Sequence, residues 1–494
     1  MLSPDLTARL REALAGAGYG FDAVVAQLGA TAHEALARNE TTPALRRTAG
    51  DSPLEGLVRL FLLQAGVDRD AADRALPGLV DPLVAVGMLE EGGGEVRALV
   101  DCRPYADDEH DLWVVSDLTP GLDGSDAQVG PDHVLGISPA STSLAQLTVR
   151  RPVGRSLDLG TGCGVQALHL ATHSDQVIAT DVNERALAIT RLNCGLNGVA
   201  NVDVRAGSLL DPLAGERFDL IATNPPFVIG PGTGELLVYR DSGLPGDQVV
   251  EQIVRGAPEH LAPGGWLQVL ANWAVVEGRP WEERLADWLP ADHTALVVQR
   301  EVLDPTAYVE LWLKDAGLHG SVAYRTRYDA WLDWFEEQQI EALGFGWICV
   351  RAAPGGQQLL DWPYAVEQPI APAVAAWGEA AARLAGLSDE ALLATHPTAA
   401  PDVRQETDGA PGAADPETIV LRQQRGLRRA RTVDTVVAGF VGAADGDLST
   451  AQLLDALASL LGRSPTELRT EYLPLVRDLV AEGFLSLTGD SALP

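Results

Sequence analysis

Short apolar runs alternate with amphipathic stretches through the middle of the chain. Apolar residues recur at helical spacing over 165–173, 183–196, 247–261 and 281–289. Strands that alternate with helices predict an α/β fold with a mostly parallel sheet covered on both faces. Ligands of such sheets bind at the carboxyl ends of the strands. Seven runs predict the strands, at 155–159, 176–180, 202–206, 218–223, 266–271, 294–301 and 346–352.

Both ends of the chain predict smaller, mostly helical units. The pattern Leu79-Val80-x-x-Leu83-Val84-Ala85-x-Gly87-x-Leu89 recurs as Leu475-Val476-x-x-Leu479-Val480-Ala481-x-Gly483-x-Leu485. A helix that closes on glycine and turns into a short strand is typical of a winged-helix unit. We therefore predict winged-helix-like domains at 1–110 and 417–494.

The central region, 111–388, is predicted to be one domain that carries an insertion at 304–344. The insertion is rich in aromatic residues, and we expect most of them to be core, although Arg325 and Arg327 could help to clamp a substrate. Residues 389–416 are rich in Ala, Pro, Asp and Thr without apolar periodicity. That composition predicts a flexible linker before the last domain.

The charge of the chain changes the expectation about its partners. A formal net charge of −33 repels a polyanion, so it favours a protein or a small molecule as substrate. The segment 422–431 opposes this trend, because it carries five arginines in ten residues. It is interpreted either as a contact for RNA or an acidic protein face, or as the solvated start of a helix.

The remaining composition points to an ordinary reducing compartment. Four cysteines, at 102, 163, 194 and 349, lack the spacing of a zinc site or a disulfide framework, so we expect buried thiols and no metal. No apolar run is long enough to span a membrane, and the first residues predict a capped helix rather than a secretion signal. We expect a cytoplasmic protein without membrane contact.

The first predicted strand leads into a glycine-rich turn, from Asp158 through Gly160, Thr161 and Gly162 to Gly164. These glycines allow a tight turn under a bound nucleoside, and the following helix offers free N–H groups. A dinucleotide-binding turn is the alternative. Asp158 argues against it, because a carboxylate would repel a pyrophosphate but suits a ligand with an ammonium and a cationic sulfur.

Two more strand ends extend the predicted cofactor site. Asp181 and Val182 end the second strand, where a carboxylate can accept both hydroxyls of a ribose. The alternative is that Asp181 only caps the next helix. The third strand ends near Ser208 and Leu209, which are placed to contact the edge and the face of an adenine, with Asp211 as a substitute for Ser208.

The fourth strand ends in Asn224-Pro225-Pro226-Phe227, and Asn224 is predicted both as a catalytic and as a cofactor-binding residue. Two prolines stiffen this turn and leave the Asn224 side-chain oxygen and the Pro225 carbonyl as fixed acceptors. Two acceptors on one NH2 group suit a planar nitrogen that becomes more cationic as it attacks a methyl group. Phe227 provides a flat wall for the planar group. An ordinary strand-ending turn is the structural alternative.

Together these motifs resemble the class I methyltransferases with an Asn-Pro-Pro-Phe motif, of the small-domain type. Release-factor glutamine methyltransferases and ribosomal-RNA guanine methyltransferases share the glycine turn, the acid-ended strand and the double proline. The loop 239–247 resembles an Asp-Gly-Gly segment of the glutamine group, with Ser242 in place of a glycine. The resemblance covers about 130–275 and implies a seven-stranded Rossmann-like sheet with S-adenosylmethionine as cofactor.

The sequence therefore predicts an S-adenosylmethionine-dependent N-methyltransferase that modifies a planar amide or amino nitrogen, with a slight preference for a protein glutamine. The alternatives are an exocyclic amine of an RNA or DNA base, a small-molecule acceptor, and a binding module without catalysis. The terminal domains are candidates for substrate docking or dimerisation.

Overall fold

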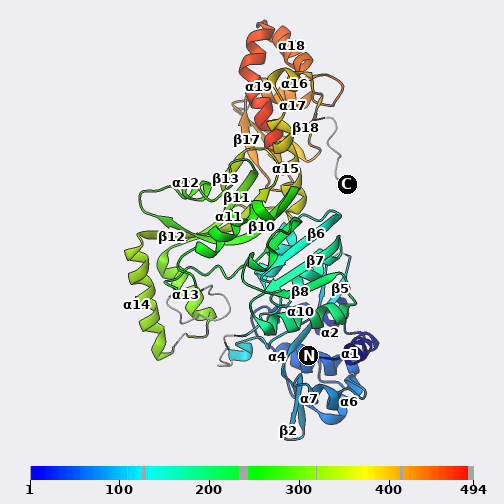
Figure 1. Cartoon of the computed structure of the whole chain (residues 1–494). Coiled ribbons are helices and arrows are strands. Elements are labelled where there is room, and N and C mark those ends of the chain that lie inside the picture. The colour runs from blue at the N-terminus through cyan, green and yellow to red at the C-terminus, as the bar shows by residue number, and fades with distance from the viewer. Residues whose placement is uncertain are drawn as a thin grey trace.

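The computed structural model arranges the chain as an N-terminal helical unit, a large central sheet and a C-terminal helical unit (Figure 1). The two helical units lie at opposite ends of the molecule, with the sheet between them. No helix among the described residues combines the length and the apolar character needed to cross a bilayer. The described residues are 2–107, 109–124, 130, 132–232, 243–318, 320–411 and 416–487.

The N-terminal unit consists of short helices and a small antiparallel sheet of order β1-β3-β2. A hairpin of β4 (Asp101–Ala106) and β5 (Asp111–Ser116) joins this unit to the central domain. The winged-helix-like character of residues 1–110 stays a prediction. The elements are α1 (Pro4–Gly16), α2 (Phe21–Leu28), α3 (Ala30–Leu36), α4 (Thr42–Arg47), α5 (Pro53–Leu57), η1 (Val58–Leu62), β1 (Val67–Asp68), α6 (Arg69–Ala75), α7 (Val80–Ala85), β2 (Leu89–Gly92) and β3 (Glu95–Ala98).

The central sheet has the order β13-β11-β12-β10-β9-β6-β7-β8. The neighbours from β10 to β8 run parallel, and β12 is antiparallel to both β10 and β11. Its members are β6 (Val153–Leu159), β7 (Ser174–Asp181), β8 (Val202–Ala206), β9 (Phe218–Thr223), β10 (Leu261–Val276), β11 (Thr294–Leu303), β12 (Ile340–Arg351) and β13 (Gln357–Asp361).

All seven predicted strands are present, but the predicted count of seven is wrong because β13 adds an eighth strand. β13 pairs in parallel with β11 at the edge of the sheet. None of its five residues is fully buried, so the strand needs no apolar run and gives no strong sequence signal.

Helices cover both faces of the sheet, as the alternation of strands and helices predicts. Adjacent residues of β9 show this, because Leu220 packs into one core and Ile221 into the other. The Ile221 core is completed by α11 (Gln248–His260) and α12 (Trp281–Ala286). The Leu220 core is completed by α8 (Pro139–Leu147), α9 (Val165–Ala171) and α15 (Ala371–Ala385).

The insertion forms two helices, α13 (Pro305–Asp315) and α14 (Val322–Glu337), beside the sheet. Tyr308, Trp312, Trp331 and Phe335 are all buried in a separate apolar cluster with Val228 and Ile229. The preferred interpretation of these aromatic residues as core is therefore confirmed.

The predicted flexible linker at 389–416 is wrong over the residues that the structure describes. This stretch contains α16 (Asp389–Ala394), β14 (Pro397–Ala399) and β15 (Val403–Asp408). β14 pairs with β18 (Leu485–Leu487), and β15 pairs with β16 (Thr418–Gln423), which pairs with β17 (Ala430–Val433). Most side chains of β15 are exposed, so backbone pairing holds this strand without the apolar periodicity that predicts one.

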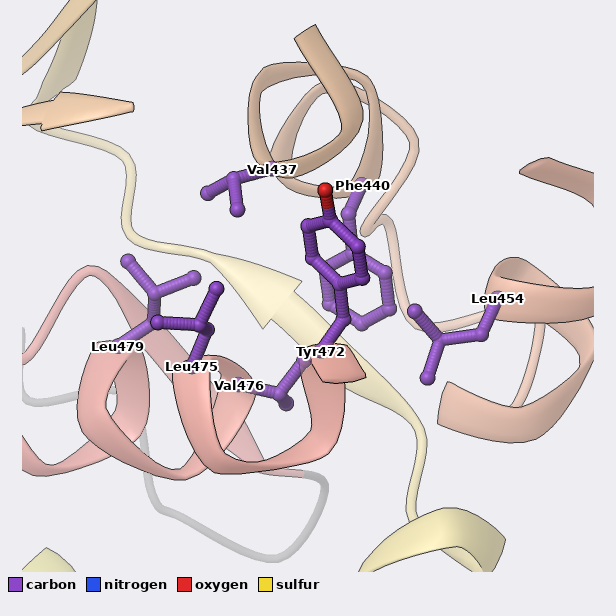
Figure 2. Close-up of a pocket in the computed structure, with 7 residues that line it drawn as sticks. All are labelled: Val437, Phe440, Leu454, Tyr472, Leu475, Val476 and Leu479. Atoms are coloured by element: carbon purple, nitrogen blue, oxygen red, sulfur yellow. The ribbon is translucent and has the colours of Figure 1, made fainter. Parts of the chain in front are cut away.

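The C-terminal core lies between α17 (Thr435–Gly442), α18 (Thr450–Leu461) and α19 (Pro465–Ala481). Figure 2 shows seven side chains that converge there, among them Phe440 and Tyr472. The space between them is only about 10 Å³, which is no more than one water probe needs. The lining is almost entirely apolar, so we interpret this gap as a packing defect in a core and not as a ligand site.

Candidate functional site

The ends of β6, β7, β8 and β9 lie side by side at one edge of the parallel sheet. These four strand ends carry the predicted cofactor and acceptor residues. The hydroxyl of Thr223 donates to the carbonyl of Leu159 at 2.7 Å, which brings Asn224 next to Gly160. The amide of Gly207 donates to the carbonyl of Asp181 at 3.0 Å and attaches the β8 loop to the same edge. The topology thus gathers residues that are more than 60 positions apart.

The glycine turn is open where a ligand would pass and crowded where the helices meet. Gly160 and Gly162 have φ of 74° and 55°, and a Cβ added at either would meet nothing within 4 Å. Gly164 has φ of 82°, and its added Cβ would lie 2.8 Å from Cγ2 of Thr190 on α10 (Glu184–Asn197). The first two glycines therefore leave room above the turn, whereas the third permits the close approach of α10.

Asp158 lies beneath the turn and holds it to the following helix. One carboxylate oxygen accepts from the hydroxyl of Thr161 at 2.6 Å and from the amide of Ala167 at 2.9 Å. Burial raises the pKa of Asp158 to about 7, against the opposing effect of these two hydrogen bonds. The structure assigns Asp158 a supporting role for the turn, and its predicted contact with the ligand's ammonium stays a prediction.

This raised pKa makes the stability of the domain depend on pH. The folded protein keeps the Asp158 proton up to about pH 7, whereas the unfolded chain releases it near pH 4, so folding loses up to about 1.4 kcal/mol per pH unit between these values. Asp158→Asn keeps both acceptor contacts but has no proton to lose. We expect the free energy of unfolding of the variant, relative to the native chain, to rise from pH 5 to pH 7. Urea unfolding at each pH measures this, and a constant difference would contradict it.

Asp181 connects the end of β7 to the glycine turn. Its two carboxylate oxygens accept from the amides of Gly162 and Asn183, both at 2.9 Å. Asn183, not Asp181, caps α10 by accepting from the amide of Arg185 at 2.9 Å, so the capping alternative for Asp181 is wrong. Burial raises the pKa of the Asp181 carboxyl.

Val182 follows Asp181 and leaves 70% of its surface exposed. An exposed branched apolar side chain beside an open turn suits contact with an apolar ring face. In the β8 loop, Leu209 has the left-handed φ of 45°, and the carbonyl of Ser208 accepts from the amide of Asp211 at 3.0 Å. Neither Ser208 nor Asp211 is singled out for the adenine by these contacts, so both assignments stay predictions.

Two buried polar side-chain atoms at this edge have no protein partner among the described residues, the hydroxyl oxygen of Thr180 and the side-chain oxygen of Asn224. The Asn224 oxygen is buried, and no hydrogen-bond donor within the described residues reaches it. A buried acceptor without a donor costs about 1–3 kcal/mol, so such an atom points to a missing ligand. Pro225 is buried, and the rings of Phe227 and Trp312 meet edge to face with centroids 6.1 Å apart.

Two residues that hold the site together were not among the candidate site residues predicted from the sequence. Asn193 on α10 donates to the carbonyls of Cys163 in the turn and Val115 in β5, both at 2.8 Å. Asp247 lies buried at the end of the 239–247 loop and accepts two bonds of 2.7 Å from Arg284. Residues 239–242 of that loop lie outside the described residues.

A cavity larger than the gap in the C-terminal core lies away from this edge. It measures about 490 Å³ and lies before β6, at the amino end of the strands, where Arg151 pairs with Glu379 on α15 and Arg150 pairs with Asp107. It contains none of the predicted site residues. The four cysteines are free and buried, as expected, and no group of three or more potential ligands in the described part of the chain is placed to hold a metal ion.

Three segments of the chain match known family models. Residues 136–279 match the model described as Methyltransferase small domain. Residues 16–99 match Domain of unknown function (DUF7059), and residues 375–487 match Domain of unknown function (DUF7782). The last match begins within α15, ahead of the predicted linker, which agrees with the ordered elements found there.

Curated relatives are similar to part of the chain. A release factor glutamine methyltransferase of Xylella fastidiosa is 39% identical over 131 residues, which are 24% of this chain and 47% of that protein. A ribosomal protein uL3 glutamine methyltransferase of Bradyrhizobium diazoefficiens is 40% identical over 23% of this chain and 40% of that protein. A ribosomal RNA small subunit methyltransferase C of Klebsiella pneumoniae is 37% identical over 24% of this chain and 31% of that protein. The chain matches less than half the length of each of these relatives. Residues 136–279 are therefore similar to the methyltransferase small domain, and they lie between two segments similar to domains of unknown function.

Proposed function

We propose that the protein binds S-adenosylmethionine at the edge formed by β6 to β9 and methylates a planar amide nitrogen. The observation that carries this proposal is the buried, unpartnered oxygen of Asn224 beside the open glycine turn. A primary amide or an exocyclic amine has the donor that this atom lacks. Asn224 is neutral, so it can accept a hydrogen bond from such a nitrogen without gaining or losing a proton.

The residues present fit the proposed cofactor. Gly160 and Gly162 leave open space where a side chain would intrude. Asp181 offers its carboxylate to the ribose hydroxyls, and Val182 offers an exposed apolar surface to the adenine. Bound S-adenosylmethionine would supply an electrophilic methyl group, which leaves its sulfur as the lone pair of the acceptor nitrogen forms the new bond.

The chain's own part in this transfer is to orient and stabilise the acceptor. The side-chain oxygen of Asn224 and the carbonyl of Pro225 each accept a hydrogen bond from one N–H of the acceptor group. The lone pair of that nitrogen then faces the methyl group of the cofactor. These acceptors favour the transition state because the nitrogen becomes more cationic there. The methylated nitrogen then loses one proton to water, and no strong general base is required. Phe227, fixed against Trp312, packs on the planar group.

The distribution of charge supports a protein acceptor over a nucleic acid. Of the five arginines in 422–431, Arg422 pairs with Glu406 at 2.8 Å, and Arg431 pairs with Glu482 at 3.0 Å. Arg429 is buried beside the ring of Trp362, so it is not available to phosphates. The segment forms parts of β16 and β17, not the start of a helix. Three of the five arginines are therefore paired or buried and cannot attract phosphates. The net charge of −33 then favours a protein acceptor over a nucleic acid.

Methyl transfer to a cell extract tests the function and the acceptor class together. The purified protein is incubated with extract and tritiated S-adenosylmethionine, and the macromolecular label is then treated with ribonuclease or with protease. We expect protease to release the label. Release by ribonuclease would favour the nucleic-acid alternative, and label confined to the small-molecule fraction would favour a small acceptor. Cofactor binding without any transfer would indicate a non-catalytic binding module.

Two further assignments accompany this proposal. We place the protein in the cytoplasm, since four free buried thiols suit a reducing compartment. We assign substrate docking to the terminal domains at 1–110 and 417–494, because they flank the sheet on both sides (Figure 1). Dimerisation through the same domains is the alternative.

A further inference from the structure

The acceptor loop that begins at Asn224 is held by the helices of the insertion. Phe227 meets Trp312 of α13, and two residues later the amide of Ile229 donates to the hydroxyl oxygen of Tyr308 at 2.8 Å. Tyr308 also lies on α13 and is 0% exposed. The loop and the insertion thus share a polar contact in an otherwise apolar cluster.

Contacts with the insertion continue on both sides of residues 233–242. A Cβ added at Gly230 would lie 3.3 Å from Cζ2 of Trp331, and one added at Gly246 would lie 3.8 Å from Trp334. The amide of Gly246 donates to the carbonyl of Gly230 at 2.9 Å. The described ends of the loop are therefore joined to each other and packed against α14.

Tyr308 links three parts of the molecule at once. Its hydroxyl oxygen accepts from Ile229 of the loop and from the side-chain amide of Asn272 in β10 at 3.1 Å. Burial raises the pKa of Tyr308 well above its ordinary value, so the phenol stays neutral. The neutral hydroxyl accepts both hydrogen bonds and so holds the loop and β10 at fixed positions relative to α13 of the insertion.

We propose that Tyr308 is a positioning residue for methyl transfer and that α13 and α14 form the outer wall of the acceptor pocket. This inference rests on the proposed function. The insertion lies outside the three matched segments, 16–99, 136–279 and 375–487, so the methyltransferase small domain does not itself supply this wall. The wall next to Phe227 is aromatic, which suits a flat, uncharged amide or ring and opposes a bulky aliphatic acceptor.

Tyr308→Phe tests the positioning role, with Tyr19→Phe as the matched control. Tyr19 is equally buried, and its hydroxyl donates to the carbonyl of Cys102 at 2.7 Å in the N-terminal unit. Amide hydrogen exchange is measured on the full chain with S-adenosylhomocysteine bound. We expect Tyr308→Phe to speed exchange over 227–232 about tenfold, because Ile229 loses its acceptor, and to leave 159–165 unchanged. Tyr19→Phe should leave both segments unchanged.

Activity supplies the second readout. With the extract as acceptor, Tyr308→Phe should lower the maximal rate about tenfold at an unchanged KM for S-adenosylmethionine, whereas Tyr19→Phe should preserve the rate. Unchanged exchange over 227–232 would overturn the positioning role even if methyl transfer is confirmed. Absence of transfer by the native chain would overturn the proposed function and leave the exchange result valid.

A second variant guards against misfolding of Tyr308→Phe. Trp334 is partly buried, so Trp334→Leu removes the ring that lies beside Gly246 at a smaller cost in stability. We expect faster exchange over 243–247 and a lower rate of transfer with unchanged S-adenosylhomocysteine binding. Exchange and transfer both equal to those of the native chain would show that the insertion does not shape the acceptor pocket.

Discussion

Replacing Asn224 with alanine should lower the rate of methyl transfer by about 10²–10³-fold, the range found when one preorganised polar group is removed from an active site. The variant loses the oxygen that orients the acceptor nitrogen and stabilises its growing positive charge. The glycine turn and Asp181 are untouched, so the Kd for S-adenosylhomocysteine should stay within about threefold. Initial rates with tritiated S-adenosylmethionine and calorimetric titration measure the two quantities.

Asn201→Ala is the matched control for this result. Asn201 precedes β8, and its side-chain amide donates to the carbonyls of Ala171 and Ser174 at 3.0 and 2.8 Å, away from the carboxyl edge of the sheet. The Asn201→Ala variant should be less stable than the native chain. At a temperature where it remains folded, its rate of methyl transfer should be unchanged. A rate for Asn224→Ala equal to that of the native chain would remove the proposed catalysis. Equal losses of rate and cofactor binding would mean that Asn224 acts through the cofactor site.

Asp181→Ala should raise the Kd for S-adenosylhomocysteine about 10²-fold or more. The proposed contacts are two hydrogen bonds from ribose hydroxyls to a carboxylate, each worth about 1.5–3 kcal/mol. The variant also loses the bond from the Gly162 amide, which helps to fix the turn. Isothermal titration calorimetry gives the Kd, and the same titration with NADH should show no binding to the native chain.

Asp203→Ala is a suitable control because Asp203 lies on the neighbouring strand β8 and forms an exposed pair with Arg205. Exposed pairs contribute little, so this variant should bind as the native chain does. An unchanged Kd for Asp181→Ala would show that its carboxylate serves only the turn and the helix start. Binding of NADH in place of S-adenosylhomocysteine would restore the dinucleotide alternative.

The parts of the fold that follow local patterns were predictable, and the parts that depend on distant pairing were not. The inner strand β9 is buried along nearly its whole length, so its sequence is mostly apolar. β13 and β15 are partly exposed, and their pairing with β11 and β16 satisfies the backbone without an apolar pattern. The composition of such a segment resembles that of a linker, and only its pairing in the folded chain shows that it is a strand.

The same distinction applies to the candidate site. Asn224 and the glycines are identifiable because each follows a predicted strand directly. Tyr308 and Asn193 act over separations of 79 and 78 residues, to Ile229 and Val115, and only the folded chain brings these pairs together. Asp181 illustrates an intermediate case, because its position was predicted and its bond to Gly162 was not.

The attachment of the β4–β5 hairpin to α10 limits how the protein can be divided. Asn193 and Asn197 exchange hydrogen bonds with Val115 and Trp113 of β5, and Leu196 is buried in the N-terminal core. A fragment starting at 117 would leave the side-chain amides of Asn193 and Asn197 without their partners in β5. It would also expose Leu196 of α10, the helix that begins beside the cofactor edge. Any excised catalytic fragment must therefore retain the hairpin, and a replacement for the first hundred residues must offer α10 an apolar surface of similar shape.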